Sequence, residues 1–236
     1  MRRLGIITGM TIEAACINAA SAALSESIRP FVIAVGADPE KAKQAARNFA
    51  DLGVAGLVSF GVAGGLDPSL VPGDVVLANT VWQPNDDAIP THAVWRDAVA
   101  TDARTLRCFA DVAVAGSDYA ITSAVAKAAL LERSGAAVVD MESHGVAVAA
   151  QEAGLPFLVV RAVADPALRA LPAAALAGIG PNGSRRPFAV FAKLLANPTA
   201  LPALIRLAKD SNKAMKSLST IAASVIQCWP KNVGET

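Results

Sequence analysis

The chain has 236 residues and a formal net charge of +1, with 53% hydrophobic and only 17% charged residues. This composition excludes a disordered chain, and the balanced charge provides no basic surface for a nucleic acid backbone. The length suits one α/β domain over residues 1–236. The apolar excess indicates a subunit interface, an apolar ligand, or both.

Cysteine and histidine are too few and too scattered to suggest a metal site. Cys16, Cys108 and Cys228 are far apart, and His92 and His144 do not pair with them along the sequence. We therefore expect no disulfide framework, no metal and no cofactor. No uncharged apolar run reaches the ~18–20 residues that a membrane helix needs, so we expect a cytoplasmic protein.

Short apolar runs alternate with helix-like segments in chain order. The predicted strands cover residues 4–8, 31–35, 56–60, 74–81, 112–115, 136–141 and 156–163. The predicted helices cover residues 11–25, 39–52, 122–134, 142–153, 167–176, 188–196 and 200–227. Loops are expected at 61–66, 82–96 and 178–187, and a flexible tail at 229–236. This alternation is typical of an α/β fold with a mixed, mostly parallel central sheet flanked by helices, here with additional C-terminal helices.

Four carboxylates stand at or just beyond the ends of predicted strands: Glu13, Asp140, Glu142 and Asp165. Ligands of such sheets bind beyond the carboxyl ends of the strands, where partial burial raises a carboxyl pKa and permits acid–base chemistry. The alternative is that each carboxylate caps the following helix. Asp165 precedes a proline, which also suits a helix start.

A glycine-rich segment follows the predicted strand at 56–60. Gly61, Gly64 and Gly65 would let backbone approach a ligand closely, or would simply form a tight turn. The first strand is followed only by Gly9, without the repeated glycines of a dinucleotide-binding site. We therefore do not expect a dehydrogenase.

Three segments together resemble a known family. They are residues 5–13 (GIITGMTIE), residues 60–74 (FGVAGGLDPSLVPGD), and VDMES at 139–143 continuing to PFLVVRAVAD at 156–165. The chain resembles the purine nucleoside phosphorylase and 5′-methylthioadenosine/S-adenosylhomocysteine nucleosidase superfamily. It is most similar to the hopanoid-associated phosphorylase branch, which is associated with removal of adenine from adenosylhopane.

The resemblance implies cleavage of an N-glycosidic bond through an oxocarbenium-like transition state. By the family pattern, Asp165 protonates N7 of the purine and Glu142 binds ribose hydroxyls. Met141 would pack against the ribose, and Glu13 would activate the attacking water, with a solvated side chain on the first helix as the alternative for Glu13.

The resemblance also implies roles for the glycines and for an aromatic residue. Gly61, Gly64 and Gly65 would shape the chain beside the sugar and the nucleophile. Tyr119 lies near the position where the family places an aromatic ring against the base, with core packing as the alternative. His144 is expected to face a carboxylate, and Arg161 to pair with an acid near the site or within the core.

Glu13 bears on the choice of nucleophile. A carboxylate base suits water, whereas phosphate needs cations or N–H donors, and the sequence places no arginine near Gly9 or Gly61. Arg29 and Arg47 are remote candidates. Hydrolysis is therefore favoured, and the alternatives are a phosphate-dependent phosphorylase or a catalytically silent protein that binds a nucleoside or a lipid.

The expected partner is a purine nucleoside, in the hopanoid branch a lipid-linked one. The family forms homo-oligomers, in agreement with the apolar excess. Residues 188–227 carry Lys and Arg beside apolar positions, which suits either contact with an anionic membrane surface or ordinary packing on the sheet or a partner subunit.

Overall fold

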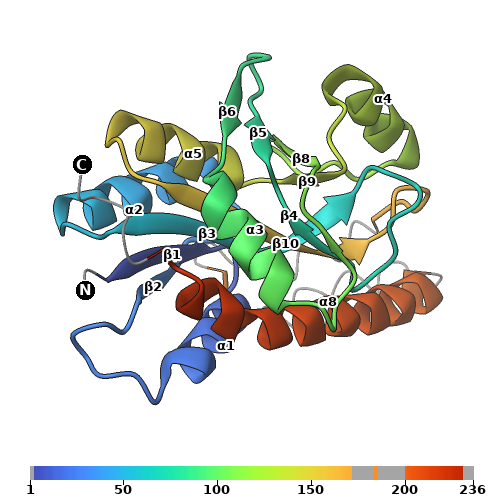
Figure 1. The fold of residues 1–236 in the computed structure, drawn as a ribbon. Coiled ribbons are helices and arrows are strands. Elements are labelled where there is room, and N and C mark those ends of the chain that lie inside the picture. The colour runs from blue at the N-terminus through green and yellow to red at the C-terminus, as the bar shows by residue number, and fades with distance from the viewer. Residues whose placement is uncertain (1–2, 172–182, 185–199, 231–236) are drawn as a thin grey trace.

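A ten-stranded mixed sheet forms the centre of the molecule, with helices on both faces (Figure 1). The computed structural model describes residues 3–171, 183–184 and 200–230. Within these residues the chain folds as the single α/β domain expected from the sequence, with a mixed sheet flanked by helices.

The strands follow one another in the sheet in the order β6-β5-β8-β9-β3-β10-β4-β7, with β1 paired to β3 and β2 paired to β1. Most neighbours are parallel, whereas β10 with β4, β3 with β9, and β5 with β6 are antiparallel. The strands are β1 (Leu4–Thr8), β2 (Phe31–Ala34), β3 (Gly56–Gly65), β4 (Val75–Leu77), β5 (Thr80–Trp82), β6 (Ala88–Pro90), β7 (Cys108–Phe109), β8 (Ala113–Gly116), β9 (Val138–Asp140) and β10 (Phe157–Asp165).

Two hydrophobic layers enclose the sheet. On one face, α2 (Pro39–Asp51) and α5 (Ser143–Glu152) pack small side chains closely against the strands. On the other face lie α1 (Thr11–Ser21), α3 (Ala93–Asp102) and the long α8 (Leu201–Gln227). Because both faces of the central strands are covered, every residue of β1 and β10 is buried, which explains their continuous apolar runs.

A smaller layer forms where α4 (Ala124–Ser134) covers the sheet near β8 and β9. Ser123 caps this helix by accepting a hydrogen bond from the backbone N–H of Ala126, and Gly135 ends it in the left-handed conformation. Helix α2 begins where the helix at 39–52 was expected, with Asp38 as its cap and Pro39 in its first turn.

The glycine segment 61–65 is not a loop, which corrects the sequence-based expectation. Strand β3 continues to Gly65 because residues 61–64 pair with β10 on one side, and Gly64 and Gly65 pair with β9 on the other. The predicted loop at 82–96 is also wrong in part, because it contains β6 and the start of α3. The glycines of 61–65 and the polar residues of 82–96 favour loops by themselves. Pairing with neighbouring strands stabilises regular structure in both segments, and burial of Trp95 also stabilises the start of α3.

The C-terminal expectations are met in part. Helix α8 corresponds to the helix predicted at 200–227, and its apolar side is buried on the sheet, as in the packing alternative. Residues 166–171 form turns, and the remainder of the helix predicted at 167–176, together with that at 188–196, lies outside the described residues. Trp229, in the expected tail, is buried edge-on against Trp95. No helix among the described residues is long and apolar enough to cross a membrane.

Candidate active site

A cavity of about 380 Å³ lies beyond the carboxyl ends of the central strands. Its wall combines the chain after β1, the start of α1, the ends of β3, β9 and β10, the segment 119–121, and one side of α8. The sequence-predicted residues that line it are Glu13, Gly64, Tyr119, Asp140, Met141, Glu142 and Asp165. Gly61 and Gly65 lie behind the wall rather than in it.

Glu13 is buried at the start of α1, with 2% of its surface exposed, which excludes a solvated side chain. Its Oε1 accepts a hydrogen bond from the backbone N–H of Val62 at 2.8 Å, and its Oε2 accepts one from Met10 at 2.7 Å. Burial raises the pKa of Glu13, while the Val62 N–H and the charge of Arg161 act in the opposite direction. The carboxyl group is thus held rigidly in a partly desolvated site.

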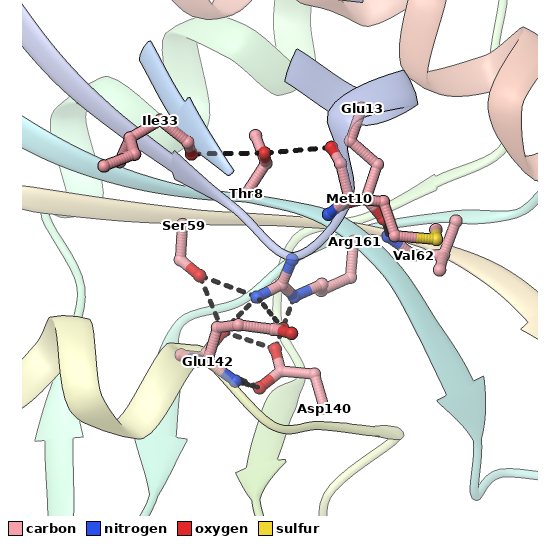
Figure 2. Close-up of polar contacts among 10 residues, drawn as sticks. Thr8, Met10, Glu13, Ile33, Ser59, Val62, Asp140, Glu142 and Arg161 are labelled. Carbon is pink, nitrogen blue, oxygen red and sulfur yellow. Dashed lines mark hydrogen bonds and ion pairs between the residues drawn. The ribbon is translucent and has the colours of Figure 1, made fainter. Parts of the chain in front are cut away.

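Arg161 on β10 is completely buried beside these carboxylates (Figure 2). Its Nε donates to Asp140, and its Nη2 donates to Ser59 Oγ at 2.6 Å and Glu142 Oε2 at 3.3 Å. Its Nη1 is buried without a hydrogen-bond partner among the described residues. Arg161 is therefore a buried ion-pair residue that does not itself line the cavity, and the acids that it pairs with, Asp140 and Glu142, do line it.

The position of Arg161 corrects the expectation that no arginine lies near Gly61. Parallel pairing of β3 and β10 places Arg161 directly opposite Gly61. A Cβ atom on Gly61 would lie 2.7 Å from Arg161 Nη1 and 2.8 Å from Glu13 Oε1. Glycine is required here because the guanidinium and the carboxylate occupy the space of a side chain. Arg29 and Arg47 bind backbone carbonyls and Glu152 instead.

Three carboxyl groups, those of Glu13, Asp140 and Glu142, surround the single guanidinium of Arg161. Burial is the largest cause that raises the pKa of Glu142 to about 8; Arg161 acts in the opposite direction, and the neighbouring Asp140 and Glu13 add to the rise. The cluster therefore carries more potential negative than positive charge. When its carboxyl groups are ionised, such a cluster stabilises a cation in the cavity and disfavours an additional anion.

Asp140 has a structural role that matches the capping alternative. Its Oδ1 accepts hydrogen bonds from the backbone N–H groups of Glu142 at 3.1 Å and Ser143 at 2.9 Å, at the start of α5. Its other oxygen binds Arg161 and the Ser143 hydroxyl. Asp140 thereby fixes the backbone of Met141 and Glu142 at the cavity.

Asp165 is the last residue of β10 and is 7% exposed at the cavity wall. No helix begins there, because the following residues form turns, so the capping alternative does not apply. Its Oδ2 is bound by the ammonium group of Lys127 from α4. Burial raises the pKa of Asp165, while Lys127 and Arg169 act in the opposite direction. Lys127 was not among the residues expected at the site, because 38 residues separate it from Asp165 along the chain.

The other residues expected at the site differ in their position relative to the cavity. Met141 lines the cavity, and Tyr119 stands at its rim with 70% of its surface exposed, so Tyr119 is not a core residue. His144 faces Asp118 at 3.1 Å, as expected, and does not line the cavity. Among the described residues, no group of three His, Cys, Asp or Glu side chains is arranged to hold a metal ion.

Comparison with known proteins identifies the family of the chain. The family model described as the phosphorylase superfamily matches residues 27–196. The chain belongs to the phosphorylase superfamily. Membership of this superfamily is consistent with an enzyme that cleaves N-glycosidic bonds. No protein with a curated description matches the sequence.

Solved structures share the fold of this superfamily member at low sequence identity. The 5′-methylthioadenosine/S-adenosylhomocysteine nucleosidase of Neisseria meningitidis, in complex with methylthio-immucillin-A, is 15% identical with a TM-score of 0.75, covering 97% of this chain and 100% of that chain. The corresponding nucleosidase of Colwellia psychrerythraea 34H, in complex with adenine, is 18% identical with a TM-score of 0.71, covering 96% and 95%. The futalosine hydrolase of Helicobacter pylori is 19% identical with a TM-score of 0.62, covering 70% and 88%.

Proposed function

We propose that this protein is a nucleosidase that hydrolyses the N-glycosidic bond of a purine nucleoside and releases adenine. The observation that carries the proposal is that Glu13, Glu142 and Asp165 line one cavity. Adenine bound to the Colwellia relative supports the choice of base.

Each carboxyl group has a distinct role in the proposed reaction. Asp165, whose pKa is raised by burial, donates a proton to N7 of the base and makes adenine a better leaving group. Glu142 accepts hydrogen bonds from ribose hydroxyls, and the ionised carboxyl groups of the cluster favour the positive charge that develops on the sugar. Met141 covers the ribose with an apolar surface.

Water is the proposed nucleophile, with Glu13 as its base. A phosphate ion would need N–H donors and cations, but Glu13 itself already occupies the N–H groups of Met10 and Val62. Among the described residues, the buried Arg161 is surrounded by the carboxyl groups of Glu13, Asp140 and Glu142, which repel an incoming phosphate when they are ionised. A water molecule carries no charge and meets no such repulsion.

We propose further that the substrate carries an apolar group on its ribose, as adenosylhopane does. Ile12, Leu207 and Met215 line the same cavity as the carboxylates, so polar and apolar subsites adjoin. An apolar substituent that covers these side chains would be removed from water on binding. The resemblance to the hopanoid-associated branch favours a triterpenoid substituent.

The test is adenine release from adenosine, 5′-methylthioadenosine and adenosylhopane, each with and without phosphate. We expect phosphate-independent release, with the highest kcat/KM for adenosylhopane. Strict phosphate dependence would contradict the nucleophile, and a preference for adenosine would contradict the apolar subsite. Absence of turnover with retained binding would favour the catalytically silent alternative.

Homo-oligomer formation remains part of the proposal and rests on the apolar composition. Light scattering after gel filtration measures it directly, and a mass equal to that of the single chain at micromolar concentration would contradict it.

A further inference from the structure

Lys127 occupies an unusual position on α4. It is the one buried residue of this helix, and none of its surface is exposed. Lysine is almost never fully buried without a partner. Taking an ammonium group out of water is unfavourable unless its donors are satisfied. A lysine in such a position therefore indicates a specific set of acceptors.

The acceptors of Lys127 all belong to the end of β10 and the turn that follows. Its Nζ donates to Asp165 Oδ2, to the carbonyl of Pro166 at 3.1 Å and to the carbonyl of Arg169 at 3.2 Å. An ammonium group has three N–H donors, and these three acceptors satisfy all of them. The lysine thus joins α4 to the proposed acid and to its connecting turn.

The ion pair leaves the two oxygens of Asp165 in different surroundings. Oδ2 is bound by Lys127, whereas Oδ1 has no hydrogen bond within the part of the chain that the structure describes. Asp165 contributes to the cavity wall, and both of its oxygens lie beside Gly64 of the same wall, at 3.4 and 3.5 Å from the position of a Cβ atom there. Lys127 therefore binds Oδ2, while Oδ1 remains available to a ligand.

We infer that Lys127 is the positioning residue of the proposed acid: it holds Asp165 with one oxygen free for the purine, and its charge controls how readily the acid releases its proton. This inference rests on the proposed function. An opposite charge within a few ångströms favours the ionised form of a carboxyl group, so Lys127 makes Asp165 a stronger acid than burial alone would.

Other charged groups near Asp165 also affect its protonation, so a test must leave these groups unchanged. Arg169, in the turn after β10, lowers the pKa of Asp165 and is itself paired with Asp210 of α8. The remaining titratable groups that line the cavity are Glu13, Tyr119, Asp140 and Glu142.

The test is the pH dependence of adenine release by Lys127→Met, which removes the charge and keeps the length of the side chain. Without the ammonium group the pKa of Asp165 rises, so the alkaline limb of kcat, where protonated Asp165 is lost, moves to higher pH by about 1–3 units. The value of kcat falls by about 10²-fold because the acid is weaker and less well positioned, while KM changes much less. Lys127→Arg keeps the charge and should keep the alkaline limb in its original place.

The matched control is Lys216→Met on the exposed side of α8, which should leave the pH profile unchanged. An unmoved alkaline limb in Lys127→Met, with a lower kcat, would show a purely structural lysine and overturn the inference alone. A wild-type protein that releases no adenine from any nucleoside would overturn the proposed function, and this inference with it.

A second measurement covers the case in which Lys127→Met does not fold because Asp165 is left buried and unpaired. Asp165→Asn and the double variant Lys127→Met/Asp165→Asn contain no such unpaired carboxylate. Because Lys127 acts through Asp165, we expect both to bind adenine equally in calorimetric titrations. A more than threefold weaker affinity of the double variant would show that the lysine acts on the ligand by another route, and would overturn the inference.

Discussion

Replacing Gly61 by alanine should inactivate the protein while leaving it folded. The new Cβ atom would lie 2.7 Å from Arg161 Nη1 and 2.8 Å from Glu13 Oε1, whereas carbon atoms need about 3.5 Å to a non-bonded neighbour. The side chains must therefore move by about 0.8 Å. Both are buried and held by hydrogen bonds, so neither can move freely.

The displacement predicts separate effects on activity and on stability. A misplacement of about 1 Å in a catalytic group lowers the rate by about 10²-fold, which is our expectation for kcat of adenine release. Overpacking of a buried site lowers the free energy of unfolding by about 1–3 kcal/mol, or a few degrees in Tm. Steady-state kinetics and thermal unfolding by circular dichroism measure the two effects.

Gly53→Ala is the matched control for this experiment. Gly53 follows α2 at a φ of +73°, and an added Cβ meets no atom within 4 Å. The substitution should lower stability by about 1 kcal/mol through backbone strain and leave kcat unchanged. Wild-type kcat in Gly61→Ala would refute the argument that Glu13 and Arg161 must keep their positions for the reaction.

Three further predictions follow from the carboxyl groups and their partners. Asp165→Asn should lower kcat of adenine release by about 10²–10⁴-fold and keep nucleoside affinity, measured by calorimetry; retained turnover would exclude Asp165 as the acid. The folded chain binds the proton of Glu142 more tightly than the unfolded chain, so Tm should fall as pH rises from about 4.5 to about 8. Glu142→Gln should flatten this dependence and the exposed Glu152→Gln should not, and a Tm that rises through this range would contradict the burial argument. Arg161→Met should lower the free energy of unfolding in urea by about 3–5 kcal/mol, because Asp140 and Glu142 lose their buried counter-charge; a loss below 1 kcal/mol would show that the pair contributes little.

The location of the site could be predicted from the sequence because strand ends in a mostly parallel sheet meet at a common edge. Glu13, Glu142 and Asp165 follow or end buried strands, and the structure brings all three to one cavity. The start of α2 could also be predicted, because the cap Asp38 and Pro39 in the first turn are adjacent in the sequence.

The partners of these residues could not be predicted, because they depend on strand register and on contacts between distant segments. Arg161 faces Gly61 only through the pairing of β10 with β3. Lys127 lies 38 residues from Asp165, on a separate helix, and a lysine on a helix is usually solvated. The segment 61–65 was expected to be a loop because glycine weakens a strand. At Gly61, however, the side chains of Arg161 and Glu13 occupy the space that a side chain would need.

The central place of β3 and β10 in the sheet has a consequence for how the site is lost. These two strands carry Val62, Arg161 and Asp165, and each is hydrogen-bonded on both sides. Such strands open only when the whole domain unfolds, whereas edge strands and helix ends open locally. Inactivation by denaturant should therefore coincide with global unfolding, and the amide protons of this strand pair should be among the slowest in the molecule to exchange with deuterium.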